Sequence, residues 1–180
     1  MFNEYVESGG SMPDFSDKDH DPFWDPPEPQ LIGKSYLQLK NLGYMLDCEA
    51  TPQIFTTDSN VKGGVGGTLK CSYWPCDMTG LEDAPDDLLV DDPSELMGKE
   101  VFFRVEVEGA ENLPNDLCKD SHVNYIFKHE PDVIHRVPTV DGKNKNPVFN
   151  FKKVHRFEEV NDYMLDYINT GSVSQFLDLK

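Results

Sequence analysis

The sequence is poor in basic residues and in long apolar runs, and each shortage argues against a class of protein. Its 180 residues contain 16 Lys and Arg against 33 Asp and Glu, which gives a formal net charge of −17. A surface of that charge repels phosphate groups, so we expect no nucleic-acid partner. No stretch approaches the roughly 20 apolar residues of a membrane-spanning helix, so we expect no transmembrane segment.

Cysteine is also scarce. The chain has four cysteines, at Cys48, Cys71, Cys76 and Cys118. They are too thinly spread for the disulfide framework of a small secreted domain. Glu4 and Glu7 occupy the region where a secretory leader would carry Lys or Arg. We therefore expect reduced thiols in a soluble, cytoplasmic chain.

The apolar content predicts a folded core in spite of the acidic charge. Hydrophobic residues make up 38% of the chain and aromatic residues 11%, which argues against wholesale disorder. The charge is unevenly placed, because residues 1–98 carry 5 basic and 19 acidic side chains while residues 99–180 carry 11 and 14. This shift predicts a boundary near Gly98.

The composition divides the chain into three segments. Residues 1–30 combine Gly, Ser, Asp and Pro so densely that we expect a disordered acidic lead-in. Within it, Trp24 is costly to leave in water and is expected to dock on the following domain. Residues 31–98 are predicted to be a β region with an acidic loop, and residues 99–180 a second β unit.

Strict alternation predicts most of the strands. Val101, Phe103, Val105 and Val107 share one face of an extended segment, which is typical of a half-buried strand. Residues 123–127, 134–140 and 149–154 are further extended runs, separated by turns such as residues 141–144. Strands at this spacing favour a mainly β, antiparallel sandwich over a fold of alternating strands and helices. One short helix is predicted at residues 160–168, with Asn161 as its cap and Gly171 after its end.

The first half of the chain shows one further strand and the acidic loop. Residues 68–73 alternate in polarity, and we expect Pro75 to end that strand. Residues 77–92 gather seven carboxylates around Leu88, Leu89 and Val90. The charge of residues 77–92 predicts an exposed acidic linker, and the triplet at residues 88–90 predicts an apolar anchor for it.

The sequence contains no recognisable catalytic or cofactor-binding signature. Gly33, Lys34 and Ser35 resemble the end of a phosphate-binding loop, but Glu28 stands where that loop needs its first glycine. Cys118 lies close to His122, yet neither a third catalytic group nor oxyanion donors can be identified. We expect no enzyme activity and no cofactor in this chain.

The acidic and cysteine-containing segments do not form a predicted metal site. Cys71 and Cys76 have no second ligand pair of the kind that structural zinc needs. The carboxylates of the acidic loop lack the spacing of a calcium-binding loop. We therefore predict reduced thiols and a solvated acidic loop.

Several motifs carry a resemblance to a known family. Residues 105–114, Val-Glu-Val-Glu-Gly-Ala-Glu-Asn-Leu-Pro, and residues 146–150, Asn-Pro-Val-Phe-Asn, resemble two landmarks of C2-type β-sandwiches. Upstream motifs resemble the region behind the forkhead-associated domain of kinesin-3 motors, nearest to the kinesin-like protein six group. These motifs are residues 21–24, 31–37, 61–63, 67–69 and 92–98.

The resemblance implies that the chain is a non-catalytic tail fragment of a kinesin-3 microtubule motor. Such a tail binds a protein adaptor or cargo and contacts its own motor head in autoinhibition. It serves microtubule-based transport of vesicles or mitochondria, so a cytoplasmic, cytoskeleton-associated location on those surfaces is implied. ATP, magnesium and microtubules would be bound by a motor head that this chain does not contain. Residues 99–180 would form an incomplete C2-like sandwich.

Two hypotheses follow for the way in which the chain binds its partner. In the first, the acidic loop meets a basic protein, with contacts made by Trp24, Leu88, Leu89, Asp91 and Asp92. In the alternative, the chain is a calcium-dependent phospholipid-binding C2 module with Asp116 and Asp120 as ligands. Calcium-dependent C2 domains also use an Asp-x-Asp pair in a later loop. At the matching place this sequence offers only Asp178.

Overall fold

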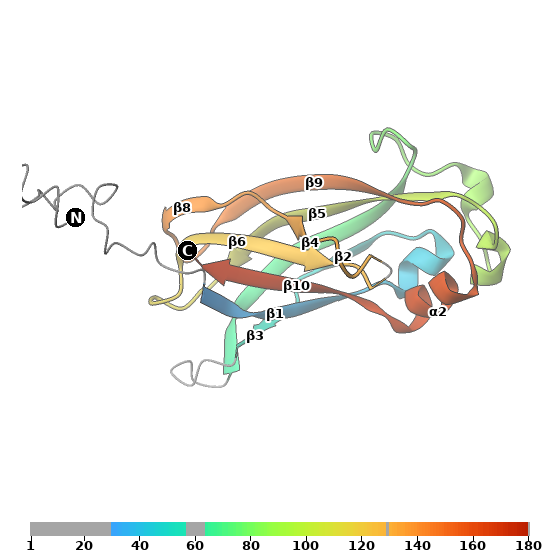
Figure 1. The fold of residues 1–180 in the computed structure, drawn as a ribbon. Coiled ribbons are helices and arrows are strands. Elements are labelled where there is room, and N and C mark those ends of the chain that lie inside the picture. Colours follow the sequence, from blue (N-terminus) through green and yellow to red (C-terminus); the bar gives the residue numbers. More distant parts are fainter. Residues whose placement is uncertain (1–29, 57–63, 129, 180) are drawn as a thin grey trace, which may run out of the picture.

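The computed structural model describes residues 30–56, 64–128 and 130–179 (Figure 1). The predicted lead-in, including Trp24, lies outside the described residues apart from Gln30. In chain order the elements are β1 (Gln30–Gln38), η2 (Lys40–Tyr44), β2 (Cys48–Ala50), β3 (Gln53–Phe55), β4 (Val65–Cys76), η4 (Asp86–Leu88), η5 (Pro93–Leu96), β5 (Val101–Glu111), β6 (Lys119–Ile126), β7 (His135–Arg136), β8 (Val140–Lys143), β9 (Val148–Phe157), α2 (Asp162–Thr170) and β10 (Ser172–Leu179), where η marks a 3-10 helix.

Ten strands of the described residues form one antiparallel sheet, which confirms the mainly β prediction. The strand order is β7-β6-β10-β1-β3-β4-β5-β9, with β2 also paired to β4 and β8 to β6. The sheet curls, because the His135 ring of β7 and the His155 ring of β9 lie 4.7 Å apart between centroids although they belong to strands at opposite ends of this order. Residues 31–98 and 99–180 both contribute strands, since β4 pairs with β5 and β1 with β10.

Strand β5 supplies the centre of the core. Val101, Phe103, Val105 and Val107 are each at most 1% exposed, as their alternation predicts. Phe103 packs against the rings of Phe127, His155 and Phe157, at centroid distances of 5.6, 5.5 and 4.8 Å. The curled sheet therefore encloses an aromatic core, whose burial provides the main favourable contribution to folding.

Two local predictions were wrong. Strand β4 does not end at Pro75 but continues to Cys76, and Pro75 pairs with Phe103 of β5. A residue without an N–H is tolerated there because β2 pairs only with residues 71–73 of β4 and leaves Pro75 without a neighbour from β2. The turn predicted at residues 141–144 is largely strand β8, which pairs with β6.

The helix prediction is confirmed, with the start and the end each two residues later than the apolar pattern suggested. The Asn161 side chain accepts a hydrogen bond from the Met164 amide at 3.0 Å and so caps α2. Gly171 follows its last residue, and Met164, Leu165, Tyr167 and Ile168 are buried. Helix α2 gathers with η2, η4 and η5 at one end of the sheet (Figure 1). This end carries the candidate functional site.

Candidate partner-binding groove

The acidic loop, residues 77–92, begins with a self-contained turn. The Asp77 carboxylate accepts hydrogen bonds from the Thr79 hydroxyl at 2.7 and 2.8 Å and from the Leu81 amide at 3.2 Å. These bonds, led by that of the Thr79 hydroxyl, hold the pKa of Asp77 below its ordinary value. The turn is joined to the sheet, because the Arg104 guanidinium donates to the Gly80 carbonyl.

The loop ends in a capping box. The Asp92 carboxylate accepts a hydrogen bond from the Ser94 amide at 2.9 Å, and the Glu95 carboxylate accepts one from the Asp92 amide at 3.2 Å. The bond from the Ser94 amide lowers the pKa of Asp92. Pro93 occupies the first turn of η5, and Leu96 is buried beneath it. Both ends of the acidic loop are thus fixed by local hydrogen bonds.

Two residues of the predicted apolar triplet, near the end of the loop, anchor it. Leu88 and Val90 are partly buried against the core. Leu89 lies between them and points outward, with 54% of its surface exposed. The anchor therefore presents one large apolar side chain to solvent at a defined position.

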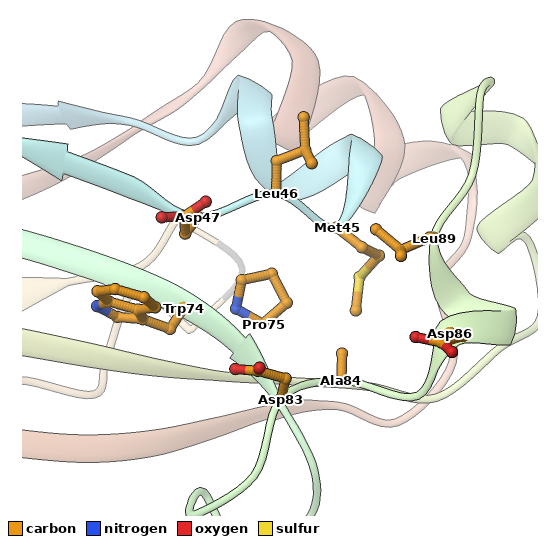
Figure 2. Close-up of a pocket in the computed structure, with 9 residues that line it drawn as sticks. All are labelled: Met45, Leu46, Asp47, Trp74, Pro75, Asp83, Ala84, Asp86 and Leu89. Atoms are coloured by element: carbon orange, nitrogen blue, oxygen red, sulfur yellow. The ribbon is translucent and has the colours of Figure 1, made fainter.

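Two adjoining hollows lie beside Leu89, and we call them together the acidic groove. The first has a volume of about 360 Å³ and the second about 410 Å³. Leu46 and Leu89 line both hollows. The first is also lined by Met45, Asp47, Trp74, Pro75, Asp83, Ala84 and Asp86 (Figure 2), and the second by Tyr44, Val90, Asp91 and Glu95.

The groove combines apolar walls with carboxylates. Figure 2 shows Pro75, Met45 and Leu89 around the first hollow, with Asp83 and Asp86 beside them. Five carboxylates line the two hollows, those of Asp47, Asp83, Asp86, Asp91 and Glu95, and no Lys, Arg or His of the described residues does so. Lys99 reaches the loop from outside, where its ammonium donates to the Asp87 carbonyl at 3.4 Å. The groove therefore presents a negative potential around an apolar centre.

Local backbone geometry explains how residues 44–47 reach the groove. Met45 follows η2 in the left-handed region, with a φ of 54°. Its amide donates to the Leu42 carbonyl at 3.0 Å and closes the 3-10 helix. Met45 is 4% exposed whereas Leu46 is 49% exposed, so the turn buries one side chain and presents the next.

The structure brings together some of the predicted contact residues. Leu89 and Asp91 line the groove, whereas Leu88 lies against the core beside it and Asp92 uses its carboxylate as a helix cap. Trp24 lies outside the described residues. Four further lining residues were not predicted from the sequence, namely Met45, Leu46, Asp47 and Trp74. The Met-Leu-Asp run that follows η2 was the available signal.

The residues of the calcium alternative do not form a comparable site. The Asp120 carboxylate accepts a hydrogen bond from the Gly142 amide at 2.5 Å and lies 3.7 Å from the Lys119 ammonium. Asp116 is exposed. Within the ranges that the structure describes, no group of three or more His, Cys, Asp or Glu side chains is placed to hold a metal ion. The C2-type calcium site thus has no support from the geometry.

Comparisons with known proteins point to one kind of relative. No protein-family model matches the chain. The chain is 25% identical over 159 residues to the kinesin-like protein KIF28P of Homo sapiens, a match that covers 87% of this chain and 16% of that protein. It is 25% identical over 172 residues to the kinesin-like protein KIF28 of Mus musculus, which covers 92% and 16%, and 24% identical over 147 residues to that of Rattus norvegicus, which covers 80% and 13%.

The chain spans less than a fifth of the length of these curated relatives. Among the helices of the described residues, none has the length and apolar character needed to cross a bilayer. At 24–25% identity over most of its residues, the similarity supports a relationship between this chain and the kinesin family.

Proposed function

We propose that the chain is a non-catalytic part of a kinesin-3 motor that binds a protein adaptor or cargo through the acidic groove. The groove carries the proposal, because it is a concave surface that combines apolar side chains with five carboxylates. Its charge suits a partner segment rich in Lys and Arg. The similarity to kinesin-like proteins supplies the motor context.

The finer assignment, a kinesin-3 tail with a C2-like sandwich, is supported by the way the two C2-type motifs meet. Residues 105–114 and 146–150 belong mostly to the paired strands β5 and β9, with Gly109 opposite Val148. The Asn146 side chain accepts a hydrogen bond from the Asn112 amide at 2.9 Å. Two motifs that are distant in the sequence therefore form one corner of the fold.

In this proposal the groove would act first by electrostatic steering. Exposed carboxylates attract a basic segment from solution and lose that attraction as salt screens them. Apolar contact with Leu46, Leu89 and Trp74 would then slow dissociation. The partner is an adaptor or cargo protein on vesicles or mitochondria, or a basic surface of the motor head when the motor is autoinhibited.

The chemical steps of transport lie outside this chain in the proposal. A motor head would bind ATP, magnesium and microtubules, and this chain would contribute recognition in a cytoplasmic, cytoskeleton-associated protein. Regulation by autoinhibition would follow if the head and the cargo competed for the groove.

A charge reversal in the full-length motor tests the proposal. Asp83, Asp86 and Asp91 are replaced by Lys, and Asp92 is left intact because it caps η5. The matched control replaces Asp132, Asp141 and Glu159 by Lys. These three carboxylates are exposed and do not line the groove, so the control changes the net charge by the same amount as the groove variant.

The measurements are the amount of motor bound to purified mitochondria and vesicles and the microtubule-stimulated ATPase rate. We expect the groove variant to lose binding, or to gain ATPase activity through loss of autoinhibition, with a weaker salt dependence than the control. Equal organelle binding, ATPase rate and salt dependence in the two variants would show that the groove serves neither role.

A further inference from the structure

The two hollows of the acidic groove share a boundary formed by Leu46 and Leu89, which we call the ridge. Leu46 and Leu89 line both hollows, and each is about half exposed, at 49% and 54%. Tyr44, Val90 and Glu95 lie on one side of this pair, and Met45, Trp74 and Pro75 on the other. A partner that fills both hollows must therefore present a side chain to each.

We propose that the occupant is a basic amphipathic helix that seats two large apolar side chains, one helical turn apart, on either side of the Leu46–Leu89 ridge. The inference rests on the proposed function and specifies the partner's chemistry. On a helix, residues i and i+3 or i+4 lie on one face, about 5–6 Å apart at Cβ. A helix lying across the ridge can thus fill both hollows, as in other helix-in-groove complexes.

The backbone around the groove disfavours an extended occupant. A peptide strand would have to pair with residues 74–76 of β4, along the edge that β2 leaves unpaired. Pro75 has no N–H to donate there, and Cys76 is already bridged to Asp83. Strand addition therefore lacks the backbone ladder on which it depends, whereas a helix needs no backbone hydrogen bonds from the groove.

The carboxylates determine the rest of the partner's pattern. Asp47, Asp83 and Asp86 belong to the first hollow, while Asp91 and Glu95 belong to the second. Lys or Arg residues on both flanks of the helix, near each apolar anchor, would meet them. Because the groove is open to solvent and its carboxylates lie at the surface, these contacts add specificity and salt dependence more than affinity.

Designed peptides and a single reporter test the inference. The chain has two tryptophans, so Trp24→Phe leaves Trp74, which lines the first hollow, as the sole fluorophore. The main probe is a 15-residue Lys/Leu peptide with leucines at helical spacing. A second peptide has the same composition in strict alternation, and a third has Glu in place of Lys.

We expect the helical Lys/Leu peptide to shift the emission of Trp74 to the blue saturably. The alternating peptide should bind at least tenfold more weakly, and the Glu peptide should not bind. Replacing both ridge residues, Leu46→Ser and Leu89→Ser, should weaken binding of the helical peptide at least tenfold. The control is Met78→Ser with Leu81→Ser, which changes two apolar side chains outside the groove that are 75% and 84% exposed and should leave the affinity unchanged.

The outcomes separate this inference from the proposed function. Equal affinity for the helical and alternating peptides, or no effect of the ridge variant beyond that of its control, would overturn the helical occupant. The proposed function would then stand if Asp83→Asn with Asp91→Asn still weakened binding. Failure of all the Lys-containing peptides to bind would overturn the inference, and the charge-reversal experiment in the full-length motor would decide the proposed function independently.

Discussion

The hydrogen bond between Tyr125 and His155 connects β6 and β9 across the core, so its removal tests how the sheet is closed. The Tyr125 hydroxyl oxygen lies 2.8 Å from His155 Nε2, and the two residues are 0% and 8% exposed. In Tyr125→Phe, water has little access to the imidazole nitrogen that loses this partner. A net hydrogen bond is worth about 0.5–1.5 kcal/mol, and a buried polar group deprived of a partner costs about 1–3 kcal/mol. We expect Tyr125→Phe to reduce the free energy of unfolding by about 1–3 kcal/mol.

Urea unfolding followed by far-ultraviolet circular dichroism measures this loss. For a chain of this length, each 1 kcal/mol lowers Tm by about 2–4 °C, which gives a second estimate. The control is Tyr163→Phe at a tyrosine that is 54% exposed, where the change should stay within about 0.5 kcal/mol. If Tyr125→Phe is no more destabilising than Tyr163→Phe, the bond does not hold the two strands together and our account of closure is wrong.

Two further predictions concern titration and reactivity. Burial raises the pKa of Tyr73, Tyr125 and Tyr167 above the ordinary value of about 10. Because these hydroxyls would ionise first in the unfolded chain, stability is retained below pH 10 and falls as the pH rises above it. Absorbance at 295 nm should show the exposed tyrosines ionising before a cooperative step that coincides with unfolding, and reversible ionisation of all seven in the folded state would contradict the prediction. Burial also raises the pKa of the Cys76 thiol to about 11, and Cys71 and Cys118 are buried, so a thiol reagent at pH 8 should modify half-buried Cys48 first and the other three only upon unfolding. Rapid modification of more than one thiol in the folded chain would count against this placement.

The sequence predicted those elements whose causes are local. The alternation of Val101 to Val107 was enough for β5, because one face of that strand meets a continuous core. Asn161 and Gly171 were enough for α2, since its capping bond spans three residues. The prediction that β4 ends at Pro75 was wrong, because the effect of a proline on a strand depends on whether a neighbouring strand needs its N–H. Here β2 pairs with β4 only as far as Tyr73.

The groove was only partly predictable, because it too depends on contacts between segments that are distant in the sequence. Leu89 and Asp91 were visible as an apolar anchor inside an acidic run. Leu46 and Trp74 joined them only through the fold, because one follows η2 and the other lies on β4. A groove that three distant segments build together leaves no spacing signature in any one of them.

The acidic loop has a property that its composition alone would not suggest, namely a fixed conformation. An acidic run normally stays solvated and mobile, and a mobile loop would lose conformational entropy upon binding. Here Asp77 and Asp92 use their carboxylates to hold the two ends of the loop, and Leu88 and Val90 anchor it against the core. The carboxylates that line the groove are thus held in place before a partner arrives. The loop therefore divides its acidic residues between two roles: Asp77 and Asp92 order the backbone, and under the proposed function Asp83, Asp86 and Asp91 would attract a basic segment at a low entropic cost.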